Sequence, residues 1–230
     1  MHVPDGFLDA PTSVATGAVA VTAVGLALRG SRRELDDRTA PLAGLVAAFV
    51  FATQMVNFPV GAGTSGHLLG GALAAALVGP WTAVLVVSVV LLVQALLFAD
   101  GGLTALGTNI TLMAVVGVGV GWLVLVLVRA VLPKRISSIP IAAAAGALVS
   151  VPVAAAAFTG LFAIGGVADI PIGSVLTAMV TWHTAIGVGE AVITGLVVSA
   201  VTVSRPDLVY AARPVVARAA LRPRPEGGAA

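Results

Sequence analysis

GGLTALGTNITLMAVVGVGVGWLVLVLV, residues 101–128, contains no Asp, Glu, Lys or Arg and is long enough for a membrane span of about 20 residues. Four other stretches, 10–28, 39–99, 136–168 and 170–189, are also free of charge. Hydrophobic residues make up 59% of the chain and charged residues 10%, which excludes a soluble globular domain. Continuous Ala, Val, Leu and Gly runs favour helices over an outer-membrane barrel. The sequence therefore predicts an all-α, polytopic integral membrane protein.

The basic residues predict how the chain is oriented. All twelve lie in three short clusters, which is the distribution expected for cytoplasmic connections and tails. This clustering argues against a nucleic-acid partner, although the formal net charge is +2. The three clusters are Arg29, Arg32, Arg33 and Arg38; Arg129, Lys134 and Arg135; and Arg205, Arg213, Arg218, Arg222 and Arg224.

If the clusters share one side, an even number of spans must separate neighbouring clusters. Breaks in the apolar stretches then predict seven helices, with an extracytoplasmic N-terminus, a cytoplasmic C-terminus and a location in the cell membrane. The helix at 67–79 is short, and a re-entrant segment is the alternative. The seven ranges are 11–28, 41–57, 67–79, 80–99, 108–129, 140–164 and 173–203.

This topology divides the chain into a membrane domain, 1–204, and a partly disordered cytoplasmic tail, 205–230. It places four connecting segments on the outer side: 1–9, 58–66, 100–107 and 165–171. The first six residues carry no Lys or Arg, unlike the start of a signal peptide, so we expect the N-terminus to be retained. Retention of Met1 is also expected, because the residue that follows it is not small.

Two histidines fall on the predicted outer side. His2 directly follows the N-terminal amine, and such a histidine can chelate a metal through the amine of Met1, its own deprotonated amide and its imidazole. His67 follows the Gly-rich turn 61–66 and could supply a fourth nitrogen. All-nitrogen tetragonal coordination favours Ni²⁺ or Cu²⁺, with Co²⁺ a competitor. The alternative is that both histidines have ordinary structural partners.

Other polar residues on the same side are candidates for supporting roles. Asp5 lies in a turn after the N-terminal dipeptide, and Ser65 lies in the Gly-rich turn. Asp100 and Asn109 form a second polar segment, which either holds a ligating imidazole in one orientation or caps a helix. Each of these roles is an expectation from residue type and position alone.

His183 and Glu190 lie within the last predicted helix, seven residues apart and therefore on one face. Ionisable groups inside membrane helices are costly and are candidates for function. We expect them to lie too deep to join His2 as ligands. Structural hydrogen bonding and a part in ion passage or coupling both stay open, and a stand-alone ion- or proton-coupled permease using this pair is the alternative function.

Four motifs resemble the CbiM/NikM family, the substrate-specific components of energy-coupling-factor cobalt and nickel transporters. They are MHVPDGFL at 1–8, GTSGH at 63–67, ADGGLTALG at 99–107 and WHTAIGVGEA at 182–191. The resemblance covers residues 1 to about 205, and the N-terminal motif is its most specific part.

The resemblance implies seven membrane helices and a transported Co²⁺ or Ni²⁺ held by the N-terminal amine, His2 and His67. It also implies partners: a transmembrane coupling protein, two cytoplasmic ATPases and a small accessory membrane subunit. Leu112 stands where family members often have a polar residue. The sequence contains no Gly-x-x-x-x-Gly-Lys-Ser/Thr phosphate loop, so we expect a transport subunit and not an enzyme.

Overall fold

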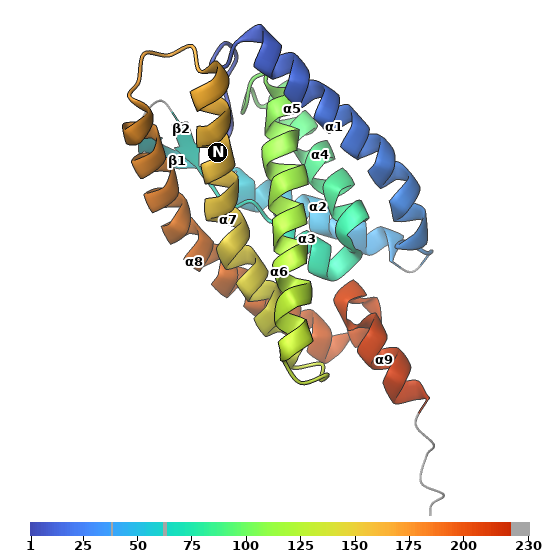
Figure 1. The fold of residues 1–230 in the computed structure, drawn as a ribbon. Helices are drawn as coiled ribbons and strands as arrows, with labels where there is room; N and C mark the ends of the chain where they lie inside the picture. The colour runs from blue at the N-terminus through green and yellow to red at the C-terminus, as the bar shows by residue number, and fades with distance from the viewer. Residues whose placement is uncertain (38, 62–63, 222–230) are drawn as a thin grey trace, which may run out of the picture.

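The computed structural model describes residues 1–37, 39–61 and 64–221, which form a bundle of long helices with one short hairpin (Figure 1). The helices of the bundle are α1 (Ala10–Gly30), α2 (Ala40–Gln54), α3 (Gly71–Val78), α4 (Pro80–Leu97), α5 (Leu106–Asn109), α6 (Val118–Val131), α7 (Ser138–Gly165) and α8 (Ile172–Ser204). The shorter elements are η1 (Ser31–Arg33), η2 (Ile110–Gly117), η3 (Pro206–Leu208), η4 (Tyr210–Ala212) and α9 (Arg213–Ala220), with strands β1 (Phe58–Gly61) and β2 (Thr64–Gly66).

Five helical segments in the described part of the chain are long and apolar enough to cross a membrane. They are Ala10–Arg33, Pro80–Leu97, Leu106–Val131, Ser138–Gly165 and Ile172–Ser204. These spans confirm a helical, multi-pass membrane protein.

The remaining two predicted spans correspond to α2 and α3, which are shorter. α2 has 15 residues. α3 has only eight and is therefore about 12 Å long, too short to cross a bilayer as a helix. The predicted helix at 67–79 starts four residues later than expected, because residues 67–70 lie in a non-helical segment.

Small residues allow the helices to approach closely, as the Gly- and Ala-rich stretches predict. Gly121 of α6 lies between α3 and α7: a Cβ added to it would stand 2.8 Å from the Cβ of Ala72. A Cβ added to Gly146 of α7 would stand 2.5 Å from the Gly121 carbonyl oxygen. These contacts leave no room for a side chain at either glycine and bring α3 against the centre of the bundle.

One end of the bundle gathers three connections that are far apart in the sequence (Figure 1). Leu8 forms an antiparallel bridge with Gly166, and Asp9 N–H donates to the Gly165 carbonyl at 2.7 Å. Asp5 contacts Thr104 in the α4–α5 connection. Three of the four segments that were predicted to share one side, 1–9, 100–107 and 165–171, are therefore observed together at one end.

The opposite end carries the basic clusters and the C-terminal elements (Figure 1). Arg129 donates to the Ala211 carbonyl and Arg213 donates to the Glu34 carbonyl, so all three clusters meet there. Val209, Ala211 and Ala212 are buried. Residues 206–212 thus form helical turns against the bundle and α9 packs on these turns, while Arg222, Arg224 and the rest of 222–230 lie outside the described residues, as does Arg38.

Two features next to the N-terminal segment were not expected. Residues 58–66 include an antiparallel pair of short strands, in which Pro59 is opposite Ser65. The span Leu106–Val131 contains an eight-residue π-helical segment, η2, directly after Asn109. π-helical turns are rare and occur often at functional sites.

Candidate metal centre

The first three residues of the chain run into the interior of the bundle. Met1, His2 and Val3 expose 1%, 6% and 0% of their surface, and the N-terminus lies within the outline of the helices (Figure 1). The Asn109 Oδ1 accepts from Val3 N–H at 2.8 Å, and its Nδ2 donates to the Val3 carbonyl at 3.2 Å. Gly102 N–H donates to the same carbonyl at 2.9 Å. Asn109 therefore fixes the backbone directly after His2.

A turn follows the buried segment and fastens it to the bundle. Phe7 N–H donates to the Pro4 carbonyl at 3.4 Å, and Gly6 adopts a φ of +72°, which favours glycine. The Asp5 Oδ1 accepts hydrogen bonds from the backbone N–H of Thr104, at 2.7 Å, and from its hydroxyl. Asp5 thus anchors this turn to the α4–α5 connection.

The imidazole of His2 contacts two polar side chains. Its Nδ1 lies 3.0 Å from Asp100 Oδ1, and its Nε2 lies 3.2 Å from Gln94 Oε1. Asn57 Nδ2 donates to the other oxygen of Asp100 at 3.2 Å, which orients the carboxylate. Asp100 is therefore placed beside the His2 imidazole, as expected for a residue that orients a ligand.

His67 stacks on His2 and presents an unpartnered nitrogen. The ring centroids are 4.4 Å apart and the ring planes differ by 24°. The His67 Nδ1–H donates to the Leu68 carbonyl at 2.8 Å, which leaves the lone pair on Nε2. Nε2 is buried and has no hydrogen-bond partner among the described residues. Buried polar atoms are rarely left unpaired, and this tautomer is the usual one for a metal-binding histidine.

The backbone after His67 is held from two other helices. The Glu190 Oε2 accepts from Leu69 N–H at 2.6 Å and its Oε1 accepts from Gly70 N–H at 3.0 Å. Gln54 Nε2 donates to the Leu69 carbonyl at 2.8 Å. Gly70 has a φ of +75°, and a Cβ there would stand 2.8 Å from a methyl of Val50. Two buried side chains therefore hold the Leu69 peptide and position His67.

Burial sets the protonation of the groups at this site. Burial lowers the pKa of the Met1 amine, against the opposing effect of Asp100. It also lowers the pKa of His2 and, more strongly, that of His67. The hydrogen bond with His2 lowers the pKa of Asp100. The amine and both imidazoles are therefore biased toward the neutral forms that bind metals, beside an ionised carboxylate.

The remaining predicted residues are His183, Glu190 and Ser65. His183 and Glu190 share a buried face of α8, as the spacing predicts. The His183 Nδ1–H donates to the Met179 carbonyl at 2.8 Å, within the same helix, and its buried Nε2 has no hydrogen-bond partner among the described residues. Ser65 lies in β2, in the segment just before His67. Glu190 contributes through the backbone after His67 and not as a ligand.

Two uncharged residues at the site were not predicted: Gln54 and Gln94, both fully buried. The sequence does contain a signal for them, since each is a lone large amide side chain in an otherwise apolar helix. Such a residue in a membrane helix must find a polar partner. No group of three or more His, Asp or Glu side chains with metal-binding geometry occurs in residues 1–37, 39–61 and 64–221. A metal site here would need nitrogens from the N-terminal backbone.

Comparisons with known proteins agree with these features. The family model described as "Cobalt uptake substrate-specific transmembrane region" matches residues 2–208. The chain is 38% identical over 210 residues to a protein of Haloquadratum walsbyi named as a metal transport protein, covering 91% of this chain and 94% of that one. It is 42% identical over 132 residues to the cobalt transport protein CbiM of Sorangium cellulosum, covering 56% and 59%.

A solved structure has the same fold. The crystal structure of a truncated transition metal transporter matches with a TM-score of 0.72 and 32% identity, over 86% of this chain and 97% of that one. The length matched by the family model and the similarity of the fold point to one conclusion. This chain is a multi-pass membrane protein that belongs to the CbiM family of cobalt-uptake substrate-specific transmembrane proteins.

Proposed function

We propose that this chain is the substrate-binding membrane subunit of an ATP-driven energy-coupling-factor transporter that imports Ni²⁺ or Co²⁺. One observation carries the proposal: the buried N-terminus places His2 against His67, whose Nε2 has no hydrogen-bond partner among the described residues. Relatives named as cobalt or nickel transport proteins support the same substrate class.

The proposed ligands are the Met1 amine, the amide nitrogen and Nδ1 of His2, and Nε2 of His67. The first three close a five-membered and a six-membered ring around one ion, and His67 completes a square plane. Nitrogen ligands in this geometry suit Ni²⁺ and Co²⁺ and are unsuited to Mg²⁺ or Ca²⁺. The amide must lose its proton, so metal capture competes with protons.

Coordination requires the two imidazoles to leave their stacked arrangement. A ring nitrogen binds a metal in the plane of its ring, and two rings that stack face to face with centroids 4.4 Å apart cannot both hold one ion in their planes. The Nδ1 of His2 must also exchange its contact with Asp100 for the ion. The Asp100 carboxylate then lies close to the divalent cation, and the attraction between their opposite charges stabilises the bound ion.

Capture and release follow from this geometry. The turn at residues 4–9 covers the bound ion, and Asp5 and Asn109 hold the covering segment in place. Release requires this segment to move, which breaks those hydrogen bonds. Because the sequence contains no phosphate-loop motif, two partner ATPases supply the energy through a transmembrane coupling protein, with a small accessory membrane subunit.

The experiment is metal binding by isothermal titration calorimetry and elemental analysis on the purified, detergent-solubilised full chain. One variant has three residues added before Met1, and a matched control has the same three residues added after Ala230. Met1 is only 1% exposed, so the N-terminal extension must bury extra atoms. The extension also moves the terminal amine three residues away from Met1, where it can no longer chelate together with His2.

We expect one Ni²⁺ or Co²⁺ for the native chain and the C-terminal extension, and loss of binding for the N-terminal extension and for His67→Ala. If the variant with the N-terminal extension still bound Ni²⁺ or Co²⁺ with high affinity, the proposed chelate by the terminal amine would be wrong. Metal uptake by the chain alone in liposomes, without ATPases, would overturn the coupling scheme. Competition between Ni²⁺ and Co²⁺ in the same titration identifies the preferred ion.

A further inference from the structure

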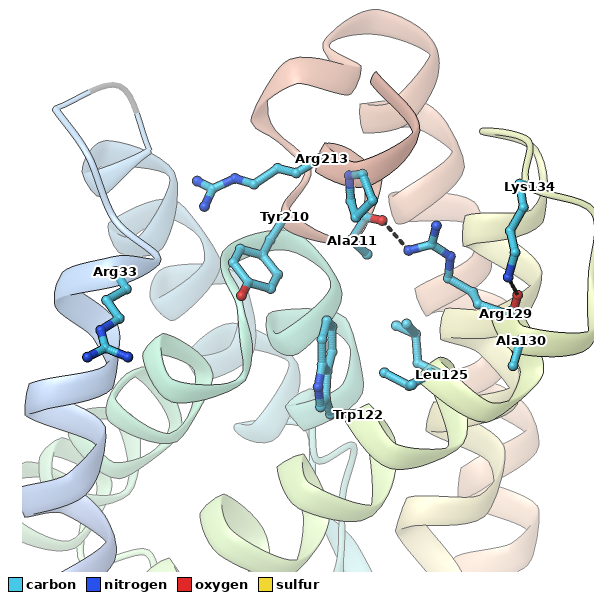
Figure 2. A pocket seen from close by; sticks show the side chains of 11 residues that line it. Arg33, Trp122, Leu125, Arg129, Ala130, Lys134, Tyr210, Ala211 and Arg213 are labelled. Carbon is cyan, nitrogen blue, oxygen red and sulfur yellow. Dashed lines mark hydrogen bonds between the residues drawn. The ribbon is translucent and has the colours of Figure 1, made fainter. Parts of the chain in front are cut away.

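A pocket of about 530 Å³, whose lining Figure 2 shows, lies at the end of the bundle opposite the α7–α8 connection (Figure 1). Four cationic side chains line it, and they come from three parts of the chain that are distant in sequence. Arg33 belongs to η1, Arg129 and Lys134 to the end of α6 and the turn after it, and Arg213 to the start of α9. The proposed metal site does not involve this pocket.

Among the described residues, no carboxylate forms an ion pair with the four cations of the pocket, and the nearby Glu34 carboxylate accepts hydrogen bonds from Trp81 N–H and Thr82. The hydrogen bonds of three cations go to backbone carbonyls: Arg129 to Ala211, Lys134 to Arg129 at 3.1 Å, and Arg213 to Glu34 at 2.8 Å. The ion pairs found in the described segments lie elsewhere, at His2–Asp100 and Arg205–Asp207. Four cations that have no carboxylate partner in residues 1–37, 39–61 and 64–221 form a site that attracts an anion.

Aromatic residues place the pocket at the depth of lipid headgroups. Trp122 lines it and contacts Tyr210, with ring centroids 5.6 Å apart (Figure 2). An adjoining groove of about 320 Å³ shares Arg33 and Tyr210 and is lined by Trp81. Trp and Tyr gather where a membrane meets water. Two of the three tryptophans and the single tyrosine of the chain thus mark one interface.

The part of the pocket on α6 is apolar. Leu125, Val126 and Ala130 contribute to its wall, and Val126 is 45% exposed on the outer surface of the helix. Cations at the end of the helices and an apolar wall along α6 match a molecule with a charged head and a hydrocarbon chain. An acidic protein segment would use the cations but has no need of the apolar wall.

We propose that this pocket binds an anionic phospholipid, with its phosphate among the four cations and an acyl chain along α6. Basic pockets between membrane helices are known to select such lipids. Because Arg33, Arg129 and Arg213 come from different elements, a bound phosphate links η1, α6 and α9 at the end opposite His2.

The test is native mass spectrometry of the full chain in detergent with added phosphatidylglycerol, and phosphatidylcholine as the neutral comparison. The pocket variant is Arg33→Gln with Lys134→Gln. The matched control is Arg32→Gln with Arg135→Gln, which removes two exposed charges one residue away, outside the pocket lining. Nickel binding is measured on every variant as a check of folding.

We expect the pocket variant to bind phosphatidylglycerol about 30-fold more weakly, since each Lys or Arg near an anionic lipid contributes about fivefold. The affinity of the control variant for phosphatidylglycerol should change less than about threefold. Both variants should bind phosphatidylcholine equally. Val126→Asn should weaken lipid binding but leave the binding of soluble glycerol phosphate unchanged.

Three results would each contradict the proposal. Equal losses in the pocket and control variants would mean general charge attraction without a site. Glycerol phosphate binding as tightly as the lipid would identify a soluble anion as the ligand. Unchanged lipid binding in the pocket variant, together with lost assembly with the coupling protein, would assign the cations to a protein contact.

Discussion

The carboxylate of Glu190 lies 2.6 Å from the backbone nitrogen of Leu69, although 121 positions separate the two residues. This hydrogen bond joins α8 to the segment that carries His67. A carboxylate can only accept here, which matches the two N–H groups of Leu69 and Gly70. Glu190 therefore acts on the proposed metal site through the backbone, which makes its effect testable apart from metal ligation.

Glu190→Gln should weaken nickel binding about tenfold, because the amide group turns a donor toward one of the two N–H groups and His67 loses its position. Glu34→Gln is the matched control. Glu34 is also buried and accepts from Trp81 N–H and Thr82 N–H, but at the start of α4 near the basic end. Both variants should lose about 2 kcal/mol of stability in thermal unfolding. Equal nickel affinity in the two variants would contradict the positioning role.

Gln54→Leu should weaken nickel binding less than Glu190→Gln, because Glu190 still accepts from Leu69 N–H and Gly70 N–H in this variant. Gln54 and Glu190 hold the same Leu69–Gly70 peptide, one at its carbonyl and the other at its N–H, so their effects should not add. A double-mutant cycle on nickel affinity measures this coupling, which we expect to be about 1 kcal/mol. Strictly additive effects would show that the two residues act independently.

Asn109→Leu should reduce nickel affinity by about 10- to 100-fold, because Val3 loses both hydrogen bonds from Asn109 and keeps the one from Gly102 N–H. Asn109→Asp keeps the acceptor for Val3 N–H and loses the donor to the Val3 carbonyl. The nickel affinity of Asn109→Asp should therefore lie between that of Asn109→Leu and that of the native chain. Full affinity in Asn109→Leu, measured by calorimetry, would show that the segment needs no such support.

Nickel binding near pH 7.5 should release about one proton, from the amide of His2. The Met1 amine and both imidazoles contribute less, because burial lowers their pKa values and keeps them largely neutral there. As the pH falls through those pKa values they protonate, so more protons are released and affinity decreases. Calorimetry in buffers of different ionisation enthalpy counts the protons, and the absence of any release would exclude a deprotonated amide ligand.

Much of the fold follows from one-dimensional patterns. Charge-free apolar stretches locate five long helices, because any segment of that length and composition must satisfy its backbone within itself in a membrane. The predicted range of the helix at 67–79 was wrong, because Glu190 and Gln54 hold residues 69 and 70 outside α3. Those contacts come from helices far away in the sequence, and no local pattern reports them.

The candidate site divides in the same way. The order of residues 1–2, with His2 directly after Met1, is read from the sequence, and it suggested the type of chelate that we propose. Tertiary structure alone decided that His67 stacks on His2, that Asn109 holds Val3, and that Gln94 and Asp100 face the imidazole. These contacts join residues that are 65 to 106 positions apart in the sequence. They depend on how the helices pack, and no local sequence pattern determines that packing.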